Sequence, residues 1–262
     1  MSAEKIIRKQ GRELLQHNYV AALVGLLMIS FVFVIYDTLT SVSSLLIMMT
    51  CEGMSDEVTD IIIYSVGLPV GIGAVYLCSP VFIGYERMYR RASVSGERFD
   101  PADLFYCFHK GRYGRALRLN LSLTVRMLVP ALVASLPPVI YYILSVNVFE
   151  HFYDTPTYRL YMFILVICSV FLTVMWGFRY FAVYALYNDY DYMSVREIFA
   201  YNREVANSAG NKPVQLLLSF IPWLLLCIAV LPMLYVIPYL SASFATSCKW
   251  LTKAQFERNM RV

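Results

Sequence analysis

Long apolar runs dominate this chain of 262 residues. A helix needs about 20 consecutive, mostly apolar residues to cross a bilayer. Runs of this kind occupy residues 19–38, 61–85, 119–146 and 158–187, and a longer apolar stretch covers 214–250. Because 59% of the residues are hydrophobic and only 15% are charged, the chain is too apolar for one soluble core. We predict an all-α fold, that of a polytopic helical membrane protein. A soluble enzyme, a disordered chain and a disulfide scaffold fit this composition poorly.

The last apolar stretch, 214–250, is too long for one span. Pro222, Pro232 and Pro238 interrupt it, and proline removes a backbone donor from a helix. We therefore divide the stretch into two short spans that meet near residues 231–232. A single kinked helix or a re-entrant pair is the alternative. With this division the fold has six transmembrane helices, arranged as three hairpins.

Basic residues are distributed unevenly between these spans. If the N-terminus is inside, 19 of the 22 lysines and arginines fall on the inner side. The outer loops carry one arginine, Arg159, and six acidic residues: Glu52, Asp56, Glu57, Asp60, Glu150 and Asp154. Because basic loops stay cytoplasmic, we predict that both termini are cytoplasmic. A cleaved signal peptide is the alternative for the first span, but no clear cleavage site follows it.

Two inner segments share a helix-start pattern. Asp100 precedes Pro101 and Asp103, and Ser194 precedes Glu197, so each capping residue has an acid three positions later. Proline at the first helical position strengthens the first case. An apolar hairpin follows each segment after a glycine-bearing break, at Gly111 and Gly114 or at Gly210.

This pattern suggests a single membrane domain built from three parallel repeats. Each repeat would be a short cytoplasmic amphipathic helix followed by a hairpin, and the N-terminal segment fits loosely as the first helix. Chance similarity between apolar hairpins is the alternative. Phe105 and Phe199 lie among arginines on two of these helices, as in interfacial helices, and we predict that they are interfacial anchors. The single domain covers residues 1–262. Its three approximate repeats cover residues 1–88, 98–187 and 194–250.

Two arginines fall inside the apolar spans. Arg126 lies about two turns into the third span, and Arg179 lies two to three turns from the inner end of the fourth. A charge at the centre of a spanning helix costs about 2.5–3.5 kcal/mol on insertion scales. Either arginine can reduce this cost by bending its side chain toward the headgroups. The functional hypothesis is an inward-facing basic pocket that holds a lipid phosphate or an anionic solute.

Glycine and proline mark positions of close packing and bending. Gly67 and Gly71 form a GxxxG motif, which lets helices approach closely, within one chain or in a dimer. Pro69 lies inside this motif and predicts a kink. Pro130 and residues 137–138 are expected to break the third span in a similar way.

Catalytic and metal-binding motifs are missing from the sequence. It contains no HExxH, GxSxG or P-loop motif. The six cysteines form no CxxC pair, and the three histidines are far apart. We therefore predict no enzymatic activity, no cofactor and no metal. No nucleic-acid-binding motif is present either. The expected partners are anionic lipids of the inner leaflet, although ordinary positive-inside bias also explains the basic loops, and a protein partner of unknown identity.

The second half of the chain carries a recognisable order of motifs. An aromatic span end at 180–189 is followed by the amphipathic segment from Ser194, then by 210–212, 218–223 and 237–239. This order resembles a family of bacterial integral membrane proteins classed as a domain of unknown function. That family is related to the membrane domain of some glycerophosphodiester phosphodiesterases. The resemblance covers about residues 98–250, and the chain departs from the family pattern at Pro222, where a glycine-like residue is expected.

The resemblance implies a six-span protein of the bacterial cytoplasmic membrane and supplies no reaction. Our first functional hypothesis is a non-catalytic scaffold, regulator or accessory subunit at that membrane. The alternative is a small transporter or lipid-handling protein whose anion or lipid-phosphate site lies near Arg126 and Arg179.

Overall fold

The computed structural model describes residues 3–51, 55–109, 111–147, 155–227 and 230–259. Within these ranges the chain is almost entirely helical and contains no strand. Three of the predicted outer acids, Glu52, Glu150 and Asp154, lie outside the described residues. The elements are α1 (Ala3–Gln16), α2 (Tyr19–Thr50), α3 (Asp56–Cys78), α4 (Pro80–Ser95), η1 (Pro101–Phe108), α5 (Tyr113–Asn147), α6 (Pro156–Gly177), η2 (Phe178–Tyr180), α7 (Val183–Asp189), α8 (Val195–Ala209), α9 (Lys212–Leu218), α10 (Ile221–Leu226) and α11 (Val230–Asn259).

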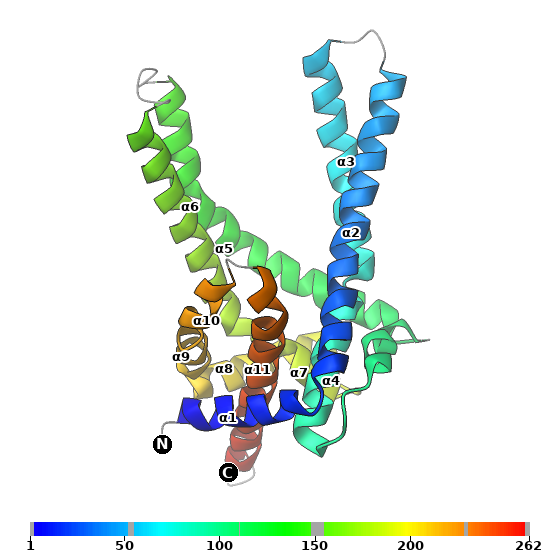
Figure 1. Cartoon of the computed structure of the whole chain (residues 1–262), viewed down its shortest axis with the longest axis vertical. Coiled ribbons are helices and arrows are strands. Elements are labelled where there is room, and N and C mark those ends of the chain that lie inside the picture. Colours follow the sequence, from blue (N-terminus) through cyan, green and yellow to red (C-terminus); the bar gives the residue numbers. More distant parts are fainter. Residues whose placement is uncertain (1–2, 52–54, 110, 148–154, 228–229, 260–262) are drawn as a thin grey trace.

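Two long apolar hairpins, α2–α3 and α5–α6, rise from a common base and diverge from each other (Figure 1). Within the second hairpin, the Ser169 hydroxyl donates to the Ala134 carbonyl, and the rings of Tyr141 and Tyr158 stack with centroids 5.4 Å apart. Most of the apolar side chains along both hairpins are exposed. An exposed apolar surface of this length suits a lipid environment and not water.

Among the described residues, five helical segments are long and apolar enough to cross a membrane. They are Tyr19–Thr50, Ile61–Ser95, Tyr113–Val146, Pro156–Asp189 and Leu231–Lys253. The helical, multi-span class predicted from the sequence is therefore confirmed. The prolines of the third span do not break it, because α5 continues through Pro130, Pro137 and Pro138 as one helix.

The predicted fifth span is not one helix. Residues 212–226 form two short helices, α9 and α10, with Pro213 and Pro222 in their first turns. Proline favours the first turn of a helix, so each proline starts a new short helix and no long one forms. Phe220, between them, is fully buried. The neighbouring ends of α10 and α11 lie lower than the far ends of the helices in the two long hairpins (Figure 1).

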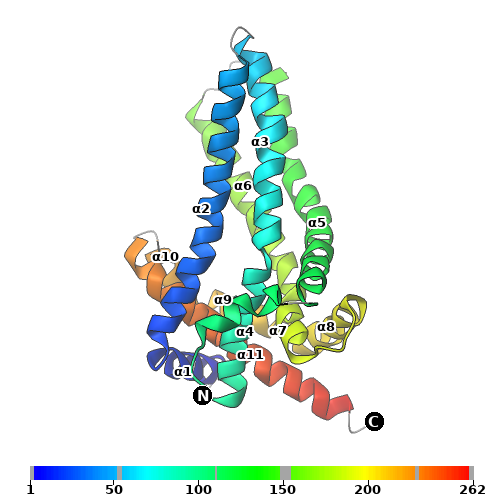
Figure 2. The ribbon, with the colours of Figure 1, turned by 90° about the vertical axis from the view of Figure 1, so that its right-hand side faces the viewer.

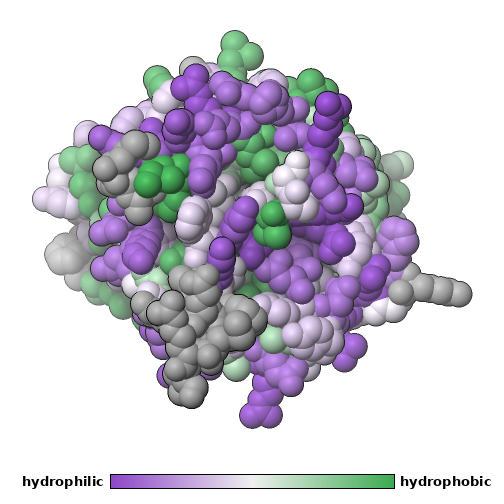
Figure 3. Space-filling model, turned by 90° about the horizontal axis from the view of Figure 1, so that it is seen from below, coloured by the Kyte–Doolittle hydropathy of each residue, from purple (hydrophilic) through white to green (hydrophobic). Residues whose placement is uncertain are grey.

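The buried core lies in the base, which consists of α1, α4, η1, α7, α8 and α11 (Figure 2). Small buried residues of α11, such as Ala242, Ser243 and Ala245, let neighbouring helices approach closely. A Cβ atom on Gly11 of α1 would lie 2.9 Å from the Ser243 Cα. The base is therefore packed like a soluble domain, and hydrophilic residues cover most of its outer face (Figure 3).

A partly buried ion pair connects three helices of the base. Arg90 of α4 donates to both carboxylate oxygens of Asp189 on α7, at 2.7 and 3.2 Å. It also donates to the Thr252 hydroxyl on α11, at 2.9 Å. Arg90 is buried, and an unpaired charge there would be costly. This pair therefore ties α4, α7 and α11 into one unit.

Helices occupy the three segments that were predicted to be amphipathic, and each of them buries apolar side chains in the base. Leu15 of α1, Leu104 of η1 and Ile198 of α8 are fully buried. The second of these helices is a 3₁₀ helix, not an α-helix. Gly111 and Gly210, predicted as breaks, both adopt positive φ, which glycine tolerates without steric cost.

Candidate functional site

Helix α8 presents an arginine-bearing face toward the foot of the second hairpin. Its start is fixed by a capping box, in which the Ser194 hydroxyl accepts from the Glu197 amide and the Glu197 carboxylate accepts from the Ser194 amide. The hydrogen bond from the Ser194 amide, with a smaller effect of the Ser194 side chain, holds the pKa of the Glu197 carboxyl below its usual range. Arg196, Phe199 and Arg203 are spaced three and four residues apart, which places them on one face of the helix.

Arg126 reaches this face from α5. Its guanidinium carbon lies 3.8 Å from the centroid of the Phe199 ring. A guanidinium over an aromatic face is stabilised by the ring quadrupole. Phe199 was predicted to be an interfacial anchor, but only 7% of its surface is exposed, so its ring is not available to lipid. It packs in the core cluster of the base with Ile198 and Val205, the buried side of α8.

Arg179 approaches the same face from η2, the short turn that ends α6. Its guanidinium carbon lies 4.6 Å from the ring centroid of Trp176. The backbone carbonyl of Arg179 accepts a 2.8 Å hydrogen bond from the side-chain amide of Asn202 on α8. Asn202 is 2% exposed. This hydrogen bond fixes the position of α8 relative to the end of the spanning segment.

The structure brings the two predicted arginines together in one cavity of about 530 Å³. Arg196 and Arg203 of α8 also line it, and we call it the arginine cavity. Among the described residues that line it there is no aspartate or glutamate; the other polar side chains come from Tyr180, Asn202 and Asn207. The arginine cavity therefore offers four cations and amide groups without a counter-charge in its wall.

A second cavity of about 670 Å³ adjoins the first. It shares Arg126, Arg196 and Phe199 with the arginine cavity and adds Arg115 and Arg118, and we call it the adjoining cavity. Two carboxylates line it, from Asp191 and Glu197.

Both carboxylates of the adjoining cavity already have partners. Glu197 belongs to the capping box. Asp191 accepts a hydrogen bond from the Tyr106 hydroxyl at 2.9 Å and lies 3.7 Å from Arg112. Arg115 donates to the carbonyls of residues 190, 191 and 193, so it holds the loop before α8.

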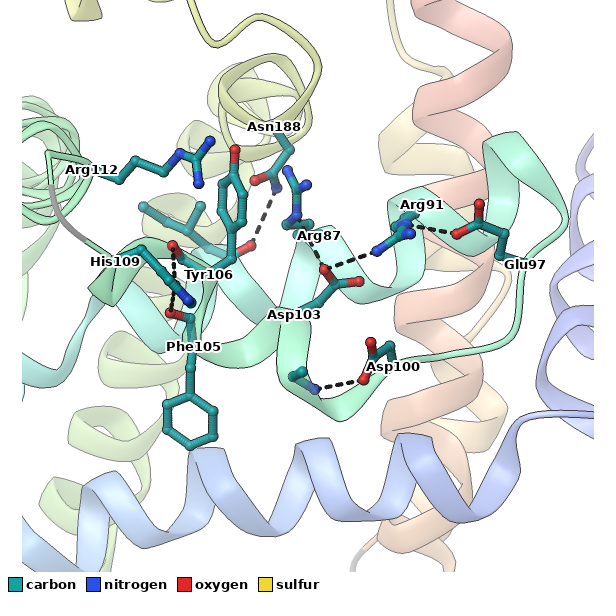
Figure 4. A network of polar contacts seen from close by, with 12 residues as sticks. Arg87, Arg91, Glu97, Asp100, Asp103, Phe105, Tyr106, His109, Arg112 and Asn188 are labelled. Atoms are coloured by element: carbon teal, nitrogen blue, oxygen red, sulfur yellow. Dashed lines mark hydrogen bonds and ion pairs between the residues drawn. The ribbon is translucent and has the colours of Figure 1, made fainter.

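The basic residues near η1 differ because carboxylates neutralise them (Figure 4). Asp103 lies 3.3 Å from Arg87 and 3.5 Å from Arg91, and Arg91 also pairs with Glu97 at 2.7 Å. Asp100 accepts a hydrogen bond from the Ala102 amide, as predicted for a helix cap. This network pairs the basic residues near η1 with carboxylates, whereas the described lining of the arginine cavity contains none.

Phe105 lies on η1 with its ring pointing away from this network (Figure 4). It is 47% exposed. Its ring neighbours Phe108, and Phe108 neighbours Tyr113, with centroid distances of 6.2 and 5.5 Å. The exposure that an interfacial anchor needs is therefore present at Phe105 and absent at Phe199.

The two glycines of the GxxxG motif lie against α2 of the same chain. A Cβ atom on Gly71 would lie 2.5 Å from the Thr40 methyl and 2.6 Å from the Tyr36 ring, so the helices touch there. At Gly67 the nearest atom would be 3.8 Å away, which is ordinary contact. Of the two alternatives, packing within the chain accounts for Gly71.

Sequence reasoning found Arg126 and Arg179 from their unfavourable position in apolar spans. It missed Arg196, Arg203 and Asn202 because these residues lie on an ordinary amphipathic helix. The spacing of Arg196 and Arg203 after the Ser194 cap was the sequence signal that could have placed both residues on one helix face. In chemical terms, guanidinium and amide groups bind phosphate or carboxylate through charge-assisted hydrogen bonds. Within the described residues, no group of three or more His, Cys, Asp or Glu side chains could hold a metal ion.

Comparison with known proteins returns no match: no family model, no curated protein and no solved structure is similar to this chain. The resemblance to the bacterial membrane family rests on the residues quoted above and stays a prediction.

Proposed function

We propose that this chain is a non-catalytic, multi-pass protein of the bacterial cytoplasmic membrane that binds the phosphate of an anionic lipid in the arginine cavity. One observation carries the proposal: Arg126, Arg179, Arg196 and Arg203 line one cavity whose described wall contains no carboxylate. Four cations held together repel one another unless an anion is bound. A phosphodiester satisfies both their charge and their hydrogen-bonding capacity.

A cytoplasmic base supports an inner-leaflet ligand. The base holds the arginine-rich segments around α4, η1 and α8, as well as α1 and the last turns of α11 (Figure 2). Placing this basic end inside follows the positive-inside rule and puts both termini in the cytoplasm. Anionic lipids of the inner leaflet are attracted to such a surface by about 1 kcal/mol per basic residue.

The surroundings of Arg126 favour a lipid over a soluble ion. Leu121, Val125, Leu128 and Val129, its neighbours on α5, are exposed apolar side chains. An acyl chain can lie along this surface while the phosphate occupies the cavity. Inorganic phosphate has no acyl chain and cannot contact this apolar surface. A binding experiment can therefore distinguish a lipid phosphate from free phosphate.

Lipid titration by native mass spectrometry tests the proposal on the purified protein. We expect phosphatidylglycerol to bind more tightly than phosphatidylcholine or inorganic phosphate. Arg126→Gln combined with Arg179→Gln should weaken phosphatidylglycerol binding at least about tenfold, since each lost charged hydrogen bond is worth about 1.5–3 kcal/mol. Lys5→Gln with Arg12→Gln, which removes the same charge from exposed positions on α1, is the control.

Two results would overturn the lipid site. One is equal affinity for phosphatidylglycerol and phosphatidylcholine. The other is unchanged phosphatidylglycerol affinity in a folded Arg126→Gln, Arg179→Gln variant. Binding of inorganic phosphate at equal affinity would assign the cavity to a soluble anion instead.

A second candidate, the accessory subunit or scaffold, is favoured by the exposed aromatic surface of η1. Phe105 and Phe108 are 47% and 41% exposed on the base, where a partner protein can reach them. Polar substitution of both residues, Phe105→Ser with Phe108→Ser, should release a stoichiometric partner from the extracted protein. Retention of that partner by the double variant would exclude this surface as the contact.

A further inference from the structure

We infer that the preferred ligand is a lipid with two phosphodiester groups, one in the arginine cavity and one in the adjoining cavity. The inference rests on the proposed function and deepens it by naming the class of lipid. It is based on the arrangement of the two cavities, which lie side by side and share lining residues.

The two cavities share a wall. Arg126, Arg196 and Phe199 line both of them. Arg179 and Arg203 belong to the arginine cavity alone, and Arg115 and Arg118 line only the adjoining one. Each cavity therefore has arginines of its own in addition to the shared pair. In the adjoining cavity Arg115 holds the loop before α8, so Arg118 is the arginine that we assign to the ligand.

The shared wall is fixed in position. Phe199 is buried in the base, and the guanidinium carbon of Arg126 lies over its ring, 3.8 Å from the centroid. A guanidinium has five N–H donors in a rigid plane. Arg126, held between the two cavities, has enough donors to contact a phosphate on either side.

The charge of the two cavities exceeds what one phosphodiester can balance. Six arginines line them, and the carboxylates in their described walls are Asp191 and Glu197. Asp191 lies 4.0 Å from Arg115, and six arginines with two carboxylates leave a formal charge of +4 in the described walls. A ligand with one negative charge leaves several guanidinium groups without an anion, at a site next to apolar membrane surface where charge is poorly screened. Two phosphodiesters joined by a short linker reduce this excess of positive charge. Because they belong to one molecule, binding of the first phosphate raises the effective concentration of the second.

Cardiolipin, whose two phosphodiesters are joined through glycerol, is the probe for this inference. Native mass spectrometry of the purified chain would compare it with phosphatidylglycerol at equal phosphate concentration. We expect one cardiolipin per chain, bound at least about tenfold more tightly than phosphatidylglycerol. Inorganic pyrophosphate, which has two phosphates and no acyl chains, should bind much more weakly.

Two single variants separate the cavities. Arg203→Gln changes only the arginine cavity and should weaken both lipids. Arg118→Gln changes only the adjoining cavity and should weaken cardiolipin about tenfold while leaving phosphatidylglycerol unchanged. Both arginines are exposed, so neither variant removes a buried contact of the base. Arg12→Gln on α1 is the matched control and should affect neither lipid.

The outcomes distinguish this inference from the proposed function. Cardiolipin that binds no tighter than phosphatidylglycerol, or that is insensitive to Arg118→Gln, overturns the two-phosphate site and leaves the single-phosphate function standing. Failure of both lipids to bind above phosphatidylcholine overturns both. Pyrophosphate binding as tight as cardiolipin would retain the paired cavities but overturn the lipid as their ligand.

Discussion

The guanidinium of Arg126 on α5 lies over the ring of Phe199 on α8, with its carbon 3.8 Å from the ring centroid. The two residues are 73 positions apart in the chain. This contact joins the second apolar hairpin to the base and forms the wall between two basic cavities. A side chain that is unfavourable within an apolar span is thereby held by an aromatic ring of the base.

Replacing Phe199 with leucine should loosen this wall. The variant keeps an apolar side chain in the core but removes the ring beneath Arg126. We expect a loss of about 1 kcal/mol of stability and about a fivefold loss of phosphatidylglycerol affinity, from the size of a cation–π contact. Thermal unfolding in detergent and lipid titration measure the two effects. Phe105→Leu, at an exposed ring, is the control, and equal effects from both variants would count against a special role for Phe199.

A negative charge added to the wall of the arginine cavity should repel an anionic ligand. Asn207 lines this cavity and is exposed. Asn207→Asp should lower phosphatidylglycerol affinity about tenfold, because the new carboxylate competes for the same arginines. Asn207→Ser removes the amide without adding charge and should have a smaller effect. Unchanged affinity in Asn207→Asp would show that the lipid phosphate binds elsewhere.

Two glycines of α3 provide a matched test of the first hairpin. A side chain at Gly71 would collide with Thr40 and Tyr36 of α2, whereas Gly73 has open space around its Cβ position. Gly71→Leu should therefore destabilise the protein by about 1–3 kcal/mol through overpacking. Gly73→Leu should be close to neutral. Thermal unfolding of the two variants checks this, and similar melting temperatures would contradict the close α2–α3 contact.

The capping box of α8 should make part of the stability depend on pH. The pKa of Glu197 is lowered because its carboxylate accepts hydrogen bonds from Ser194. The native state therefore binds this proton less readily than the unfolded state. The resulting stability is complete above the unfolded-state pKa of about 4.3 and is lost as the pH falls through the lower folded-state pKa.

Melting temperatures of the wild type and Glu197→Ala between pH 7 and pH 3 measure this contribution. We expect the wild type to be more stable at pH 7 and the difference to shrink on acidification. Glu204→Ala, on the same helix, controls for the loss of a negative charge. A difference that stays constant with pH would exclude the ionised carboxylate as its source.

The class of this protein follows from the lengths of its apolar runs. Each long apolar run must satisfy its own backbone hydrogen bonds in a bilayer, so run length alone predicts a spanning helix. Two helix starts were also predictable, because a capping residue bonds to groups close to it in the sequence. The hydrogen bonds at Asp100 and Ser194 involve residues two and three positions away. The cost of a charge inside an apolar run identified Arg126 and Arg179 as unusual.

The partners of those two arginines depend on how the helices pack. Arg196 and Arg203 join them because α8 packs across the foot of the second hairpin, and no local pattern specifies that packing. The same packing turned Phe199 inward, against the prediction of an exposed anchor. The expected fifth span became α9 and α10 because two prolines each began a short helix and Phe220 entered the core. Hydrophobicity and capping act within a few residues, whereas contacts between distant segments depend on how whole helices fit together.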